Sequence, residues 1–210
     1  MNLTYCHRCY ATLKSKKTLT HCSDCERELK EGYSCDVCDK PEFVNIWDSF
    51  FFYQIPMMFD GIEILLEKGK AHHLCALALV TYTEVMGGLL TGELKKEFGA
   101  SKSNFEAFLP YLGKKYVKLN ESFDIYKDVR SKLVHEFSPR KSHLIAITKN
   151  TLDSRIGLEY QNEHLNFHLR EYFRDFKKGV EQYRKDLKNP KDNEGVLLNF
   201  IKATVHNAQQ

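Results

Sequence analysis

The stretch Tyr126-Lys-Asp-Val-Arg130-Ser-Lys-Leu-Val-His135-Glu-Phe-Ser-Pro139 predicts the final turns of an amphipathic helix. Apolar side chains recur at helical spacing through it: Ile125, Val129, Leu133. Pro139 is expected to end the helix, because proline cannot continue the backbone hydrogen bonds and restricts the residue before it. The chain is therefore expected to be organised around a late helix that carries an arginine and a histidine.

Arg130 and His135 give this helix a chemistry beyond packing. A guanidinium is a permanent cation that matches phosphate oxygens, and an imidazole exchanges protons near neutral pH. Five residues of α-helix turn through about 500°, so the two side chains lie roughly 140° apart around the axis. A long arginine, or a second copy of the helix, is needed to bring them into one site. A solvated surface pair is the alternative explanation of the same spacing.

Arg-x4-His near the end of a late helix resembles the signature of the HEPN (higher eukaryotes and prokaryotes nucleotide-binding) superfamily, where a polar residue such as Ser131 often follows the arginine. Residues 61–69 and 76–84 resemble the start of a HEPN domain: a helix, a glycine break, then an Ala-rich helix with an acidic residue, here Glu84. The likeness covers residues 55–190. It implies a HEPN-like helical bundle and an endoribonuclease that acts as a homodimer, with two Arg–His pairs across a cleft. Such enzymes are often toxins or antiphage defence effectors.

The implied reaction is metal-independent cleavage of RNA, in which the 2′-OH attacks the neighbouring phosphorus and leaves a 2′,3′-cyclic phosphate and a 5′-OH. His135 is expected to transfer protons, and Arg130 to stabilise the charge on the phosphoryl oxygens. Glu84 is expected either to face solvent or to orient one of these two side chains. Further candidate RNA contacts are Ser131, Lys132 and Arg140.

Six of the seven cysteines form three Cys-x2-Cys pairs near the start of the chain: Cys6/Cys9, Cys22/Cys25 and Cys35/Cys38. Two such pairs supply the four thiolates of a tetrahedral zinc site, and the spacers of twelve and nine residues suit short hairpins. We therefore expect a Cys-rich, zinc-ribbon-like module over residues 1–42, folded around structural Zn2+. A disulfide cluster is the alternative, and it needs an oxidising compartment.

Six thiolates fill one four-ligand site and half of a second, so the sequence leaves one or two zinc ions open. His7 and His21 are candidates for the missing ligands, as is His72 with Cys75. We favour core packing for Cys75, because apolar residues surround it at helical period. Residues 1–42 carry seven basic and seven acidic residues, so this module shows no charge bias toward phosphates. Its expected role is docking to RNA, to a partner such as an antitoxin, or to a second copy.

Residues 43–210 predict a mainly α-helical domain with a small β-hairpin insertion. The expected helices cover 57–68, 70–90, a segment capped by Ser101 or Ser103, a segment from about Asn120, 162–188 and 193–205. The hairpin is expected from 144–148 and 156–160, around Asn150. Gly87-Gly88-Leu-Leu-Thr-Gly92 lacks the lysine of a phosphate loop, so it predicts helix packing and termination.

The 42% apolar content is sufficient for a core, and the net charge of +3 is too small to indicate nucleic-acid binding by itself. No uninterrupted apolar run reaches the length of a membrane span, and the first residues do not resemble a signal peptide. A soluble, cytoplasmic protein is expected. Two alternatives to an enzyme remain: a non-catalytic HEPN nucleotide- or partner-binding protein with a zinc recognition module, and a zinc-containing regulator that binds nucleic acid. The regulator predicts a basic, aromatic-rich module, which the even charge balance of residues 1–42 does not provide.

Overall fold

The computed structural model describes residues 4–5, 12–13, 49–68, 71–94, 100–136, 144–146, 155–161, 164–188 and 190–208. The chain divides into two compact units, Met1–Met57 together with Tyr183–Gln210, and Met58–Gln182. The described residues are mainly helical, with a small three-stranded sheet, which confirms the predicted class at this level. The predicted boundary at residue 42 lies outside the described residues and stays a prediction.

The first unit contains two short strands and a cluster of aromatic rings. Its elements are β1 (Thr4–Tyr5), β2 (Thr12–Leu13), the wide π-type turn η1 (Ser49–Gln54), α8 (Pro190–Ala208), the start of α2 (Ile55–Lys68) and the end of α7 (Leu169–Lys188). Phe50 packs edge-on against Phe51 and Phe200, with ring centroids 4.9 Å and 5.7 Å away. The guanidinium of Arg184 lies 5.7 Å from the centre of the Phe51 ring. Aromatic burial therefore dominates the core of this unit.

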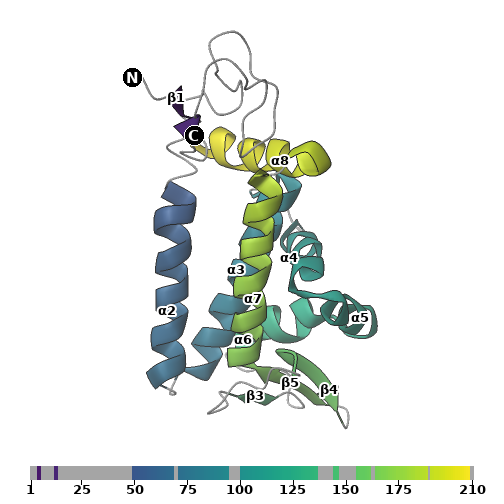
Figure 1. Ribbon diagram of the computed structural model, residues 1–210. Coiled ribbons are helices and arrows are strands. Elements are labelled where there is room, and N and C mark those ends of the chain that lie inside the picture. The colour runs from purple at the N-terminus through teal and green to yellow at the C-terminus, as the bar shows by residue number, and fades with distance from the viewer. Residues whose placement is uncertain are drawn as a thin grey trace. The chain divides into compact units, whose positions relative to one another are not determined.

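The second unit is built around α3 (His72–Thr91), which lies behind α7 in the view of Figure 1. Its other elements are α4 (Ala100–Leu112), α5 (Lys114–Ser122), the π-type turn η2 (Tyr126–Ser131), α6 (Lys132–Glu136), β3 (Leu144–Ala146), β4 (Leu158–Gln161), β5 (His164–His168) and most of α2 and α7. Helix α3 (His72–Thr91) contacts α4, η2, α6 and β3. Among the described helices, α3 has the length and apolar composition that could cross a membrane, but half of its apolar window is buried inside the protein. That burial is typical of the core helix of a soluble protein.

Glycine at position 87 allows α4 to lie directly on α3. A Cβ atom built on Gly87 would come within 1.6 Å of the backbone oxygen of Asn104 in α4. The Asn104 side-chain N–H donates a hydrogen bond to the Glu93 carbonyl at 2.9 Å, and its Oδ1 accepts one from the Thr91 hydroxyl at 2.9 Å. Gly92 ends α3 in the left-handed region, at φ 79°. The prediction of helix packing and termination for this segment is confirmed.

The sheet differs from the predicted hairpin around Asn150. Strand β5 lies between the other two, parallel to β3 and antiparallel to β4, and it occupies part of the helix predicted from Asn162. Leu165 and Phe167 alternate toward the core as a strand requires, whereas Leu165 and Leu169 also share the four-residue spacing of a helix. The sequence fits both periods over this short length, so tertiary packing decides the structure.

Two predicted helix starts are also wrong. Ser101 and Ser103 lie inside α4 and do not cap it. The helix that carries Arg130 begins at Ile125, and α5 is a separate helix before it. Gly113, at φ 129°, separates α4 from α5. A positive φ favours glycine, so the break was readable in principle from this one residue.

A buried phenol ties the sheet to the helices of the second unit. The Tyr116 hydroxyl, on α5, accepts a hydrogen bond from the Gly157 N–H at 2.7 Å and donates one to Asp175 Oδ2 on α7 at 2.7 Å. Burial, together with the Asp175 charge, raises the pKa of Tyr116, so the hydroxyl keeps its proton. A Cβ atom at Gly157 would lie 2.3 Å from Tyr172, so the chain passes close to α7 here. These contacts fix the start of β4 against α5 and α7.

Candidate functional site

The structure brings together two predicted site residues, Glu84 and Arg130. Glu84 lies in the middle of α3, and Arg130 is near the end of η2, which packs against α3. Glu84 Oε2 and Arg130 Nε are 3.4 Å apart, and the two side chains are 16% and 26% exposed. Of the two expectations for Glu84, the structure therefore favours the one in which the carboxylate orients Arg130.

Tyr126 completes the support of this ion pair. Its hydroxyl donates to Glu84 Oε2 over a long 3.4 Å, and its ring centre lies 5.5 Å from Arg130 Cζ, within cation–π range. The pKa of Tyr126 is raised mainly by burial and also by the Glu84 carboxylate, whereas a hydrogen bond with Ser101 and the Arg130 charge act in the opposite direction. The phenol therefore stays protonated at neutral pH and acts as a donor to the carboxylate.

The Nε nitrogen of Arg130 is buried without a hydrogen bond in the described structure. Its 3.4 Å distance from Glu84 qualifies as an ion pair but lacks the directed geometry of a hydrogen bond. The charges of Arg130 and Glu84 therefore attract each other, while the Nε–H bond does not point at the carboxylate. A buried donor without an acceptor is uncommon and requires an explanation.

The helix that carries Arg130 contains a wide turn. Residues of η2 adopt the π-type pattern up to Ser131, after which α6 returns to α-helical geometry from Lys132 onward. Such turns are rare in proteins and frequent at functional sites. The step from Arg130 to His135 lies almost entirely after the wide turn, so the two positions stay roughly 140° apart around the axis. One chain alone does not place both on the same helix face.

The remaining predicted RNA contacts are only partly described. Ser131 and Lys132 are both half-buried, at the junction of η2 and α6. His135 belongs to α6, but its side chain lies outside the described structure, and Arg140 lies outside it altogether. The described site thus consists of Glu84 and Arg130 with their supporting residues.

Eight of the candidate zinc ligands lie outside the described residues: Cys6, Cys9, Cys22, Cys25, Cys35, Cys38, His7 and His21. The other two, His72 and Cys75, belong to α3. Within the described ranges, no group of three or more His, Cys, Asp or Glu side chains is arranged to hold a metal ion. Cys75 is fully buried in α3, and this burial raises the pKa of its thiol to about 12. A buried, protonated thiol fits the predicted packing role and not ligation with His72.

Sequence reasoning missed Tyr126 and Ser101. Tyr126 precedes Arg130 by four residues, the spacing at which side chains meet on a helix, so the interaction was open to prediction. Ser101 comes from α4 and carries no comparable signal. Its contact with Tyr126 depends on how α4 and η2 pack, which only the folded structure shows.

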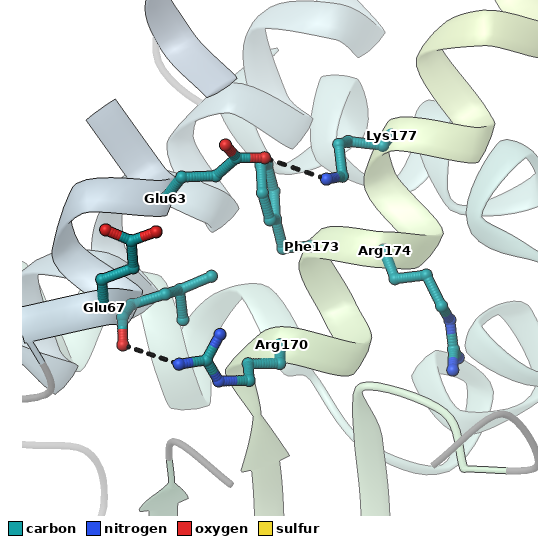
Figure 2. Close-up of a pocket in the computed structure, with 7 residues that line it drawn as sticks. Glu63, Glu67, Arg170, Phe173, Arg174 and Lys177 are labelled. Carbon is teal, nitrogen blue, oxygen red and sulfur yellow. Dashed lines mark hydrogen bonds and ion pairs between the residues drawn. The ribbon is translucent and has the colours of Figure 1, made fainter. Parts of the chain in front are cut away.

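A separate pocket of about 310 Å3 lies between α2 and α7 in the second unit (Figure 2). Arg170 donates to the Leu66 carbonyl at 3.0 Å, and Lys177 pairs with Glu63 at 3.1 Å. Arg174 binds a neighbouring carboxylate and a backbone carbonyl. The basic side chains of this pocket therefore already have partners in the protein and connect one helix to another.

The arrangement around Arg130 can hold an anion. Glu84 and Tyr126 contact one side of the guanidinium, and an arginine has five N–H donors in a rigid fork that matches phosphate oxygens. With an imidazole five residues further on, the helix carries both an anion-stabilising group and a proton-transfer group. Comparisons of the chain with models of protein families, with curated proteins and with solved structures find no match, so this geometry is what the functional argument rests on.

Proposed function

We propose that the chain is a metal-independent endoribonuclease that cleaves RNA at Arg130 and His135. The proposal rests on one observation. Arg130, five residues before His135, is three-quarters buried and contacts the Glu84 carboxylate and the Tyr126 ring. A pre-oriented cation stabilises a developing negative charge without reorganising during the reaction.

In the proposed reaction, RNA supplies its own nucleophile. A 2′-OH attacks the adjacent phosphorus, a new 2′-O–P bond forms, and the P–O5′ bond breaks. An imidazole of His135 takes the proton of the 2′-OH, and a second acid returns a proton to the 5′-oxygen. Arg130 stabilises the charge on the non-bridging oxygens. The products are a 2′,3′-cyclic phosphate and a 5′-OH.

Glu84 acts in this proposal as a positioning residue. Its carboxylate is bound to a guanidinium and accepts a hydrogen bond from Tyr126, so both interactions compete with the binding of a divalent cation. Mg2+ is usually held by one or two carboxylates in sites that activate phosphates. The engagement of Glu84 therefore supports chemistry that does not depend on a divalent ion.

The HEPN resemblance extends the proposal to a homodimer and a role as a toxin or antiphage effector in the cytoplasm. A second copy of the helix would supply the missing acid and would remove the difficulty of two side chains that face apart. We propose that residues 1–42 form the structural zinc module. Strands β1 and β2, which pair antiparallel, support this, because they bring together the two ends of the segment that carries Cys6 and Cys9.

The test is the incubation of purified protein with single-stranded RNA during brief exposure to EDTA. Cleavage should persist, and Arg130→Ala and His135→Ala should each reduce it by at least ~100-fold. Lys132→Ala should have a milder effect, since a phosphate contact contributes more to binding than to chemistry. His73→Ala, an exposed histidine on α3, is the matched control and should cleave normally. Normal cleavage by His135→Ala would end the ribonuclease proposal.

The same ion pair favours a second candidate, a non-catalytic HEPN domain that binds a nucleotide or a protein partner. Glu84 and Arg130 would then serve only to hold η2 against α3. This candidate predicts that RNA stays intact at all protein concentrations. It also predicts that Arg130→Ala changes the melting temperature without changing any product.

A further inference from the structure

A second pocket of the same unit lies between α5 and the start of the sheet, with a volume of about 520 Å3. Its lining combines apolar side chains with two lysines, a tyrosine, an amide, a serine and a carboxylate. The lining residues that matter are Lys115, Lys118, Leu119, Leu158, Tyr160 and Gln161. Helix α5 contacts β4, and Figure 1 shows it above the sheet on the side of β4.

Lys115 and Lys118 stand on one face of α5, three residues apart. Both are exposed, and neither makes an ion pair or a hydrogen bond with another residue in the described ranges. This distinguishes them from the basic residues in Figure 2, each of which has a partner. Glu159 also lines the pocket, 3.5 Å from the Nε2 atom of His168. Two ammonium groups without a partner among the described residues indicate a preference for an anionic occupant.

Tyr160 provides a supported aromatic surface at the same pocket. Its ring stacks on Phe123, with centroids 3.7 Å apart and planes inclined by 28°, and the residue is still 40% exposed. A large apolar ring at this exposure is costly to leave in water, and the stacking partner restricts its motion. Phe123 immediately follows α5, so the stack and the two lysines belong to adjoining parts of the chain.

We propose that this pocket holds a segment of single-stranded RNA, with one base stacked on Tyr160 and the neighbouring phosphates on Lys115 and Lys118. Aromatic surfaces beside basic side chains are the common means of binding single strands without reading their sequence. The naming of RNA as the strand rests on the proposed function. Phe123 precedes Arg130 by seven residues, mostly helical, so their Cα atoms lie within about 20 Å. One strand can therefore reach both places.

The test measures binding separately from cleavage. The probe is a fluorescein-labelled single strand of about 12 nucleotides with 2′-O-methyl groups, which has no free 2′-OH nucleophile and is within the usual length of such sites. Tyr160→Ala should weaken its affinity for the full chain about tenfold, and Tyr160→Phe should change it less than about twofold. The double variant Lys115→Gln/Lys118→Gln should lower the slope of log affinity against log salt by roughly 1.4, at about 0.7 per phosphate. Lys114→Gln, which removes a lysine charge from the same helix outside the pocket, is the control and should leave the slope unchanged.

The outcomes separate the two proposals. Equal affinities of the wild type and Tyr160→Ala, with equal melting temperatures, would overturn this inference even if RNA is cleaved. Tyr160-dependent binding of the probe without any cleavage of ordinary RNA would support it and remove the ribonuclease. Binding of polyglutamate that needs the lysines but not the Tyr160 ring, with no binding of the probe, would identify an acidic peptide as the occupant and refute RNA.

Discussion

Glu84→Gln is the substitution that isolates the orienting role of the carboxylate. Glutamine keeps the size of the side chain and an oxygen that can accept from Tyr126, but it removes the charge that attracts Arg130. The guanidinium stays in the protein and stays charged. We therefore expect the proposed ribonuclease to lose the orientation of Arg130 while keeping its attraction for RNA.

The magnitude follows from the geometry of the pair. At 3.4 Å and an effective dielectric constant of about 20, the Coulomb attraction is about 5 kcal/mol before desolvation. Both side chains keep some contact with water, and pairs of this kind contribute about 1 kcal/mol or less in net terms. The free energy of unfolding should fall by about 1 kcal/mol. A similar loss of transition-state stabilisation corresponds to a decrease in kcat of about fivefold.

The assay is steady-state cleavage of a short fluorogenic RNA, with thermal unfolding of the same preparations. For Glu84→Gln, kcat should fall and KM should change little, because the phosphate-binding charge remains. Glu63→Gln is the matched control, since it breaks an ion pair of similar distance, 3.1 Å, that is more exposed and belongs to another pocket. Glu84→Gln with wild-type kcat and wild-type melting temperature would refute the reasoning.

Three further outcomes are expected. Gly87→Ala should lower the free energy of unfolding by about 3 kcal/mol or more, because its Cβ would overlap backbone atoms of α4. Gly61→Ala, where a Cβ meets nothing within 4 Å, should be neutral or stabilising by up to about 1 kcal/mol. Urea denaturation of both variants checks this. Cys75 should resist thiol alkylation at pH 8, because its pKa of about 12 keeps it protonated, and a thiol titration should count it only after denaturation; the proposed zinc module further predicts that the other six thiols react only after a chelator is added. Burial alone would raise the pKa of Asp124, but hydrogen bonds from Lys102 and a backbone N–H lower it below its ordinary 3.8. The carboxylate therefore stabilises the fold above pH 3.8, and this stabilisation is lost as the pH falls through the lowered pKa. Asp124→Asn should flatten the acid limb of a curve of stability against pH, and an unchanged limb would contradict this.

The sequence predicted where the long helices α3 and α7 end, because a helix-breaking residue follows each of them. Gly92 marked the end of α3, and the break after Lys188 came at Pro190. The sheet was predicted wrongly because Leu165 and Phe167 share strand spacing while Leu165 and Leu169 share helix spacing, over the same five residues. Length and period alone could not separate the two structures there.

The candidate site was predictable as a set of chemical types and not as an arrangement. The chain pointed to Arg130 and left Glu84 with two possible surroundings. Which one holds depends on how η2 packs against α3, an interaction between segments distant in the sequence. Periodicity carries no information on such pairings, so the contacts of Glu84 and Ser101 came only from the structure, whereas the spacing of Tyr126 and Arg130 on one helix was readable from the sequence. The proposed zinc module remains a prediction from cysteine spacing.

The wide turn η2 changes how the helix can vary in evolution. A π-type turn has the same effect as one additional residue in an α-helix, and every residue after it is rotated by about 100° relative to those before it. Arg130 lies near the end of this turn and faces Glu84 from there. A deletion of one residue before Arg130 would restore a regular helix and turn the guanidinium away from α3, even though all the side chains of the site would still be present. Insertions and deletions in this helix are therefore restricted because they change the direction in which Arg130 points, even when they keep every residue of the site.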